Sequence, residues 1–387
     1  MFLWTHVPNL DFNTEDYDTS GTTFSDIVNK VILLHKGQNI NTFRLDHELE
    51  FSDFEFEAWI DSLVARNVRT LEITLQERLL LPPCLFTSFK ALVDLTLRYC
   101  GGLLSEGTVF LPALKKLRLD RITYEDDASL PHLLSGCPVL EELLIERGSL
   151  ERTVACCYIP SPTLNKFVLI SEYKNDIDDE VFRVKLDTPA LRYLKLYDSV
   201  SEDISAAALT SLIEADVSFK CKEPNLEDYV LYYQNVIEFV AGFYNVKCLK
   251  LSTLPMAQVP DSAFSALTIK FDNLTELELA GDYRFIQSFL ENADNLEILT
   301  IHIDCDDLNW MEPTQVPSCM VSHLQTVRIH QLDCVEQELS MANYILRNAK
   351  VLKRMDIYSL DCVDKLETLK RISLLERGSE ACQLVLH

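Results

Sequence analysis

Basic residues are scarce in this sequence. Its 387 residues contain 35 lysines and arginines against 60 aspartates and glutamates, which gives a formal net charge of −25 at pH 7. Proteins that bind nucleic acids neutralise phosphate groups with clusters of lysine and arginine, and anionic membrane surfaces attract the same residues. The composition therefore argues against a nucleic-acid-binding protein and against a membrane-surface protein.

Long apolar segments are also missing. No uncharged apolar run approaches the roughly 18 residues of a membrane-spanning helix, and the start MFLWTHVPNL lacks the basic and apolar regions of a secretory signal. The 12 cysteines are scattered and none is spaced C-x-x-C, so the sequence predicts neither a disulfide framework nor a zinc site. We expect an intracellular protein of the cytoplasm or nucleus.

Motifs of the common catalytic sites do not occur. The sequence contains no G-x-S-x-G elbow, no P-loop, no G-x-G-x-x-G and no H-E-x-x-H. His302 alternates with Asp304 and Asp306 as metal ligands on one side of a strand could, but a solvated strand end explains this spacing equally well. His323 and His330 flank a predicted strand with no carboxylate at a fixed offset. We therefore predict no catalytic residue, no metal and no cofactor, and expect that the protein is not an enzyme.

A repeated strand pattern runs through most of the chain. In LVDLTLRYC, Leu92, Leu95, Leu97 and Cys100 have the spacing of a leucine-rich repeat, in which one short strand per repeat turns its leucines into a continuous core. The starts are about 26 residues apart on average, within the 20 to 29 residues typical of this architecture. Thirteen units begin at 40, 68, 92, 114, 140, 164, 191, 212, 246, 274, 296, 324 and 352.

Helical segments alternate with these strands. Ser25 precedes apolar residues at helical spacing up to Gly37, and this helix would cap the open end of the first strand. Further helices are expected at 53–66, 131–135, 341–349 and 364–376 and in LEDYVLYYQNVIEFVAGF, with an extra strand VFRVKL and a final strand at 382–386. The prediction is an α/β fold, a curved leucine-rich-repeat solenoid of about thirteen strand-helix units.

The face opposite the leucines is the candidate binding surface. Side chains alternate along a strand, so the residues between the leucines line the concave face of a curved stack. About half of these positions are charged, against 25% of the chain; solvent exposure alone predicts some of this enrichment. Tyrosine and arginine tend to dominate protein interfaces. The candidate site for a protein or peptide partner on this face consists of Arg118, Lys166, Tyr193, Lys195 and Tyr197.

Three segments together resemble one family. LWTHVPNLDF resembles the segment that follows an F-box, LLSGCPVLEELLI resembles a repeat signature, and the C-terminal stretches SHLQTVRI, YILRNAKVLKRMDIYS and ERGSEACQLV resemble an FBD domain. The chain is similar to plant F-box proteins with leucine-rich repeats and a C-terminal FBD domain. The resemblance implies three parts: 1–23 as a remnant after a missing F-box, 24–303 as the solenoid with its capping helix, and 304–387 as an FBD-like domain that continues it.

The resemblance also implies a function. Members of this family hold a Skp-type adaptor of a cullin-RING ubiquitin ligase with the F-box, while the repeats recruit the protein to be ubiquitinated. Only Phe2, Leu3 and Trp4 would remain of an F-box here, so we expect residues 1–387 alone to show no measurable adaptor binding, and an adaptor to bind only if an F-box lies upstream. The alternative is a stand-alone scaffold or competitor with no ubiquitin role, and a pocket for a small hormone-like ligand is a third reading.

Overall fold

The structure, a computed structural model, divides into two units, each of which contains parallel strands and helices. These are Met1–Leu191 and Arg192–His387, called the N-terminal unit and the C-terminal unit. The described residues are 3–13, 23–47, 52–75, 80–148, 155–171, 182–198, 201–219, 226–253, 260–281, 283–303, 310–332, 336–359, 370–372 and 374–387.

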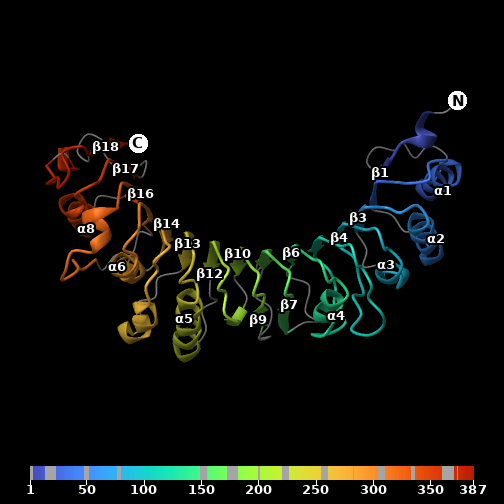
Figure 1. Cartoon of the computed structure of the whole chain (residues 1–387), viewed down its shortest axis with the longest axis horizontal. Coiled ribbons are helices and arrows are strands. Elements are labelled where there is room, and N and C mark those ends of the chain that lie inside the picture. Colours follow the sequence, from blue (N-terminus) through green and yellow to red (C-terminus); the bar gives the residue numbers. More distant parts are fainter. Residues whose placement is uncertain are drawn as a thin grey trace. The chain divides into compact units, whose positions relative to one another are not determined.

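The sheet of the N-terminal unit contains one strand per repeat (Figure 1). Its strands, in spatial order, are β1 (Asn9–Asn13), β2 (Thr42–His47), β3 (Thr70–Leu75), β4 (Asp94–Arg98), β5 (Lys116–Asp120), β6 (Glu142–Arg147) and β8 (Lys166–Ser171). Equivalent leucines pair across neighbouring strands: Leu71 with Leu95, Leu95 with Leu117, and Leu117 with Leu143. None of these four side chains is more than 1% exposed, so the repeat spacing builds one continuous apolar row.

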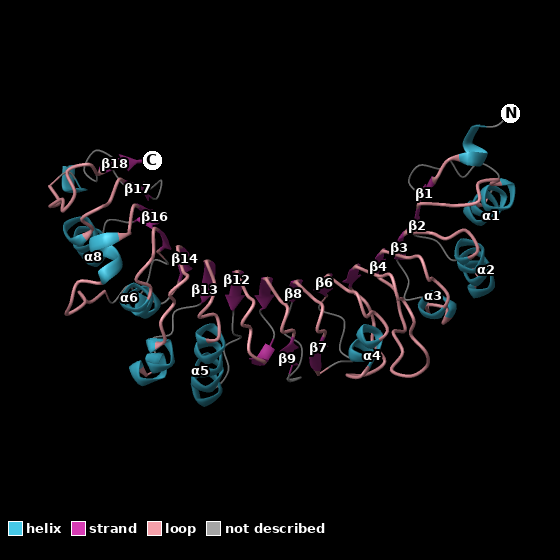
Figure 2. Cartoon of the chain, viewed as in Figure 1, coloured by secondary structure: helices cyan, strands magenta, loops and turns pink. Residues whose placement is uncertain are grey.

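Helices lie on the side of the sheet to which the leucines point, shown in cyan in Figure 2. Those of the N-terminal unit are η1 (Leu3–His6), α1 (Phe24–Leu34), α2 (Asp53–Val64), α3 (Cys84–Thr87) and α4 (Ser129–Ser135). The opposite side of the sheet, on which no described helix lies, is called the open face. Helix α2 begins with a capping box, in which Ser52 and Glu55 satisfy each other's backbone amides.

The C-terminal unit repeats this construction. Its sheet contains β10 (Tyr193–Asp198), β12 (Glu214–Phe219), β13 (Cys248–Thr253), β14 (Glu276–Ala280), β15 (Ile298–His302), β16 (Thr326–Leu332), β17 (Arg354–Ser359) and β18 (Gln383–Leu386). Its helices are α5 (Leu226–Ala241), η3 (Asp261–Thr268), α6 (Tyr283–Asn292), α7 (Ser318–Ser322) and α8 (Glu336–Asn348). Tyr233, Val236, Ile237 and Val240 of α5 are fully buried, and Val230 on the same helix is half-buried.

All thirteen predicted repeat strands are present, and the prediction of a leucine-rich-repeat solenoid is confirmed. The final strand is present as β18, and the extra strand is present as β9 (Phe182–Asp187), which pairs with β7 (Cys156–Pro160) outside the main sheet. Strand β11 (Ser201–Ala206) also lies outside it. Helix α1 begins at Phe24, one residue before Ser25, and is capped by the Thr23 side chain, which accepts from the Asp26 amide.

Strand β1 is an addition that the repeat pattern does not predict. It pairs with β2 and buries Leu10 and Phe12, so residues 9–13 extend the sheet ahead of the expected capping helix. The predicted domain limits 1–23, 24–303 and 304–387 stay a prediction. Asp304 and Asp306, together with most of the predicted helix 364–376, lie outside the described residues.

Several described cysteines are buried in the core of the repeats. Of the adjacent cysteines, Cys157 is buried and Cys156 is half-buried. Burial raises the pKa of Cys100, Cys137 and Cys319 to about 12, so these thiols stay protonated at neutral pH and react slowly.

In the part of the chain that the structure describes, no helix has the length and apolar character needed to cross a membrane.

Candidate functional site

Charges of opposite sign alternate on the open face of the N-terminal unit. Lys116, Glu142 and Lys166 occupy the same register position of β5, β6 and β8. The Lys116 Nζ lies 2.8 Å from Glu142 Oε1, and the Lys166 Nζ lies 3.7 Å from Glu142 Oε2. The hydrogen bond to Glu142 raises the pKa of Lys116, and the same bond holds the pKa of Glu142 below its ordinary value. Glu142 therefore balances part of the positive charge on this face.

Three arginines surround one buried carboxylate at the ends of β4 and β5. Arg98 Nε and Arg118 Nη2 each lie 3.7 Å from Asp120 Oδ2, and Arg121 Nη1 lies 3.7 Å from Asp120 Oδ1. The Asp120 side chain is only 7% exposed. Arg121 also lies over the ring of Tyr99, with its guanidinium carbon 5.0 Å from the ring centre. Arg98, Arg118 and Arg121 with Asp120 are called the arginine cluster.

The five residues of the predicted binding site all lie on the open-face positions of their strands, but in two units. Arg118 on β5 and Lys166 on β8 belong to the N-terminal unit, where Arg118 Nη2 donates to Glu146 Oε1 at 2.6 Å. Tyr193, Lys195 and Tyr197 on β10 belong to the C-terminal unit and are half-buried. The Lys195 Nζ lies 3.2 Å from Asp216 on β12. The predicted site as a whole stays a prediction.

Tyr193 lies in acidic surroundings within its own unit. Partial burial raises the pKa of its hydroxyl, and the carboxylates of Asp216 and Glu214 raise it further. The hydroxyl is therefore protonated at neutral pH and can donate a hydrogen bond. Its ring offers a half-exposed apolar surface beside that donor.

A column of four stacked rings occupies the open face of β15 to β18. The ring centres of His302 and His330 are 4.6 Å apart, those of His330 and Tyr358 are 4.2 Å apart, and those of Tyr358 and His387 are 4.3 Å apart. The planes deviate from parallel by 12°, 3° and 9°. The spacing follows the separation of about 4.8 Å between neighbouring strands. His302, His330, Tyr358 and His387 are called the ring ladder.

Carboxylates anchor both ends of the ring ladder. His302 Nε2 lies 3.0 Å from Glu278 Oε1, and His387 Nε2 lies 2.9 Å from Asp356 Oδ1. Arg354 donates two hydrogen bonds to the Asp356 carboxylate, at 2.7 and 2.8 Å, and these hold the pKa of Asp356 below its usual value. Burial raises the pKa of Glu278, but hydrogen bonds from Lys250 and His302 outweigh it, and the pKa is lowered.

The ring ladder was not predicted from the sequence. A signal for it exists, because His302, His330 and Tyr358 all follow the third apolar residue of their repeats. In the sequence, His302 instead alternates with Asp304 and Asp306, which lie outside the described residues, and His330 has no carboxylate at a fixed offset. The partner that the structure gives His302 is Glu278, from the preceding repeat.

His330 should make stability depend on pH. Burial and the neighbouring His302 lower its pKa from the ordinary 6.5, so the unfolded chain takes up the proton first. The contribution of neutral His330 is then complete above about pH 6.5 and is lost as pH falls through that value toward the lower folded pKa. We expect His330→Phe, which keeps a ring in the column, to flatten this part of the stability profile.

Denaturant midpoints at several pH values, for wild type and His330→Phe, measure this difference. His323→Phe is the matched control, because the half-buried His323 lies outside the ring ladder and contacts Ser322. A wild-type profile that the His330 substitution leaves unchanged would contradict the assignment.

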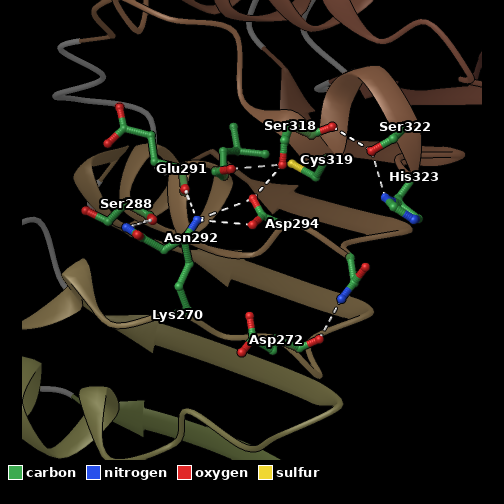
Figure 3. Close-up of polar contacts among 12 residues, drawn as sticks. Lys270, Asp272, Ser288, Glu291, Asn292, Asp294, Ser318, Cys319, Ser322 and His323 are labelled. Atoms are coloured by element: carbon green, nitrogen blue, oxygen red, sulfur yellow. Dashed lines mark hydrogen bonds and ion pairs between the residues drawn. The ribbon is translucent and has the colours of Figure 1, made fainter.

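A third polar cluster lies around α6 and α7 and is shown in Figure 3. Lys270 Nζ lies 3.2 Å from Asp294 Oδ2 and from the Glu291 carbonyl, and the Ser318 hydroxyl donates to Asp294. The hydrogen bond from Ser318 holds the pKa of Asp294 low. In a Ser-His-Asp triad the carboxylate orients the histidine, whereas here Asp294 binds Ser318 and His323 binds Ser322 (Figure 3). This cluster links successive repeats and lacks the arrangement of a nucleophilic site.

Comparisons with known proteins agree with the repeat architecture. A family model described as the LRR repeats of an FBD-associated F-box protein matches residues 56–215, and the FBD model matches residues 312–357. Neither model describes a catalytic family.

Relatives from Arabidopsis thaliana cover nearly the whole chain. A putative F-box/FBD/LRR-repeat protein is 29% identical, over 93% of this chain and 85% of its own length. An F-box/FBD/LRR-repeat protein is 26% identical, over 99% of this chain and 90% of its own length. A putative FBD-associated F-box protein is also 26% identical, over 100% of this chain and 92% of its own length. The predicted resemblance is confirmed in both the repeats and the C-terminal part.

Proposed function

We propose that this chain, a relative of the plant F-box/FBD/LRR-repeat proteins, is a protein-interaction module that binds a partner protein with the open face of its sheet. In the finer form of the proposal, the partner is a protein to be ubiquitinated and the chain acts as the substrate-recognition part of a Skp-cullin-F-box ubiquitin ligase. The names of the relatives support the finer form through their F-box. The geometry of the open face supports the coarser one.

The observation that carries the proposal is the separation of the two sheet faces. In β5, Leu117 and Leu119 are each 1% exposed, whereas Lys116 is exposed and Arg118 is half-buried on the other side. A strand between two others, such as β5 between β4 and β6, is hydrogen-bonded on both sides, so its outward side chains are held by a rigid support. Rigid presentation lowers the entropy that binding must overcome. Polar and aromatic side chains in such an array suit recognition of another protein.

Tyr193 and Tyr197 provide the test within the C-terminal unit. We expect the double substitution to alanine to weaken partner binding by about 2 kcal/mol or more if the two rings are hot spots. The thermal midpoint should stay nearly unchanged, because both side chains are only half-buried. The measurement is quantitative affinity purification from the source tissue with wild-type and substituted chains.

The control is a pair of exposed apolar residues on helices, Leu33 and Leu231, which are 82% and 58% exposed. Partners that are lost with Tyr193→Ala/Tyr197→Ala and retained with Leu33→Ala/Leu231→Ala support the open face. Equal recovery of every partner with both variants would move the binding surface away from β10.

The finer form is tested by the proteins recovered with the partner. A Skp-type adaptor that co-purifies with the protein expressed from its own gene, together with ubiquitinated partner, is the expected result for a ligase subunit. A stable partner complex without adaptor, and with no change in partner abundance when the protein is removed, would favour the alternative of a stand-alone scaffold or competitor.

A further inference from the structure

The arginine cluster of the N-terminal unit has more positive charge than its neighbours neutralise. Arg98, Arg118 and Arg121 provide three positive charges, and Asp120 and Glu146 provide two negative ones. This local excess stands against a net charge of −25 for the chain. An acidic group would therefore be attracted to the cluster while most of the remaining surface repels it.

Most hydrogen-bond donors of the cluster have no acceptor. A guanidinium has five N–H donors. Among the described residues, the Arg98 side chain donates no hydrogen bond, Arg118 donates one to Glu146, and Arg121 donates one to the Tyr99 hydroxyl. The three distances of 3.7 Å to Asp120 are longer than a hydrogen bond of 2.7 to 3.2 Å.

Asp120 itself is also unsatisfied. Its Oδ1 atom is buried without a hydrogen bond, and so is Arg118 Nε beside it. Buried polar groups are normally hydrogen-bonded, and an exception in a native fold calls for an explanation. Here Asp120 holds three guanidinium groups together by charge while leaving their donors available. The arrangement is ready to accept a second carboxylate.

The backbone places Arg121 for this role. Tyr99 and Arg121 follow β4 and β5 and have φ angles of 55° and 53°, in the left-handed region that residues other than glycine rarely adopt. Tyr99 N donates to Asp120 O at 2.9 Å and Arg121 N donates to Glu146 O at 2.8 Å, so both residues are fixed to the neighbouring strand. The Arg121 guanidinium is thereby held over the Tyr99 ring, next to Asp120.

We propose that the arginine cluster is a binding site for an acidic segment of a partner protein, with a glutamate or aspartate carboxylate accepting hydrogen bonds from Arg98 and Arg121. This inference deepens the proposed function and rests on it, since it names the chemistry of the partner at one place on the open face. A carboxylate suits the site better than a phosphate dianion, because the buried Asp120 charge repels a double negative charge more strongly. Arginine binds carboxylates through two parallel hydrogen bonds.

The test uses the full chain and a fluorescent peptide of alternating glutamate and glycine, with a glutamine-for-glutamate peptide as reference. We expect Arg98→Gln/Arg121→Gln to weaken binding of the glutamate peptide by about tenfold or more. The substitutions remove two positive charges and the guanidinium hydrogen bonds to the peptide carboxylates. Lys115→Gln is the matched control: it removes one positive charge from the same repeat at an exposed residue that pairs with Glu141 at 2.6 Å. Its effect should stay within about twofold, as for a rim charge.

A further variant separates binding from structural damage. Asp120→Asn removes the competing negative charge and should tighten the glutamate peptide by about threefold or more, a gain that misfolding cannot produce. Arg98→Lys keeps the charge without the paired donors and should still weaken the peptide. Thermal midpoints of all variants accompany the titrations.

Three results would overturn the inference: equal binding of the glutamine peptide, equal weakening by Lys115→Gln, or binding only of a phosphoserine version of the peptide. Affinity purification of natural partners distinguishes failure of the acidic-segment site from failure of the proposed function. A partner lost with the Tyr193/Tyr197 variant but retained with Arg98→Gln/Arg121→Gln refutes the acidic-segment site alone. Partners unaffected by any open-face substitution refute the proposed function.

Discussion

Leu194→Ala should destabilise the protein by about 2–5 kcal/mol, the range for removing a buried leucine side chain and leaving a cavity. Leu194 is 0% exposed in β10, and it pairs with Ala215 of β12. The Ala215 side chain is too small to move into the space that the leucine side chain leaves. Denaturant unfolding followed by circular dichroism measures the loss.

Lys195→Ala is the control for the same strand. Its side chain is 41% exposed and its ion pair with Asp216 has a distance of 3.2 Å. Exposed ion pairs contribute about 0–1 kcal/mol, so the substitution should shift the free energy of unfolding by roughly 0.5 kcal/mol at most. Equal shifts for the two variants would mean that the buried and open faces of β10 have been assigned the wrong way round.

Gly281→Ala should cause the second large loss of stability. Gly281 follows β14 with a φ of +117°, and an added Cβ would lie 2.2 Å from the Thr253 carbonyl oxygen and 2.9 Å from its carbonyl carbon. Both are backbone atoms of the preceding repeat and cannot rotate away. A strained φ costs about 1–3 kcal/mol, and a forced displacement in a packed region costs about 1–3 kcal/mol more, so we expect a loss of roughly 2–6 kcal/mol.

Gly107→Ala separates the two contributions. Gly107 has a similar φ of +111°, but nothing lies within 4 Å of its added Cβ. This variant should show only the conformational cost of about 1–3 kcal/mol. A loss at Gly107 as large as that at Gly281 would show that the approach to Thr253 is unimportant.

The repeat strands could be predicted because burial imposes their pattern. Each strand must place apolar residues on one side, and the spacing that results is visible in the sequence from Ile40 to Leu352. Strand β1 could not be found in this way, because NLDFN contains only two apolar residues, Leu10 and Phe12, and lacks the third position of the repeat.

The sites were less predictable than the fold for a related reason. Arg121 lies beyond the end of β5, and no sequence signal indicates that an arginine will adopt a left-handed conformation and lie over Tyr99. The ring ladder depends on register: only when β15, β16 and β17 pair in step do His302, His330 and Tyr358 face one another. The spacing of apolar residues within one repeat does not show that these rings will align. The alignment becomes visible only when the same outward position is compared from one repeat to the next.

The shared register of the strands also bears on how such a protein can evolve. Between β12 and β13 the chain inserts the 16-residue helix α5, whereas β4 and β5 are joined without a described helix. Even so, Asp216 faces Lys250 across one pair of strands as Thr96 faces Arg118 across the other. Insertions and deletions in the connections therefore leave the columns of outward side chains aligned. A single substitution at an outward position therefore changes the surface of one repeat and leaves the register of its neighbours unchanged, whatever the length of the connections.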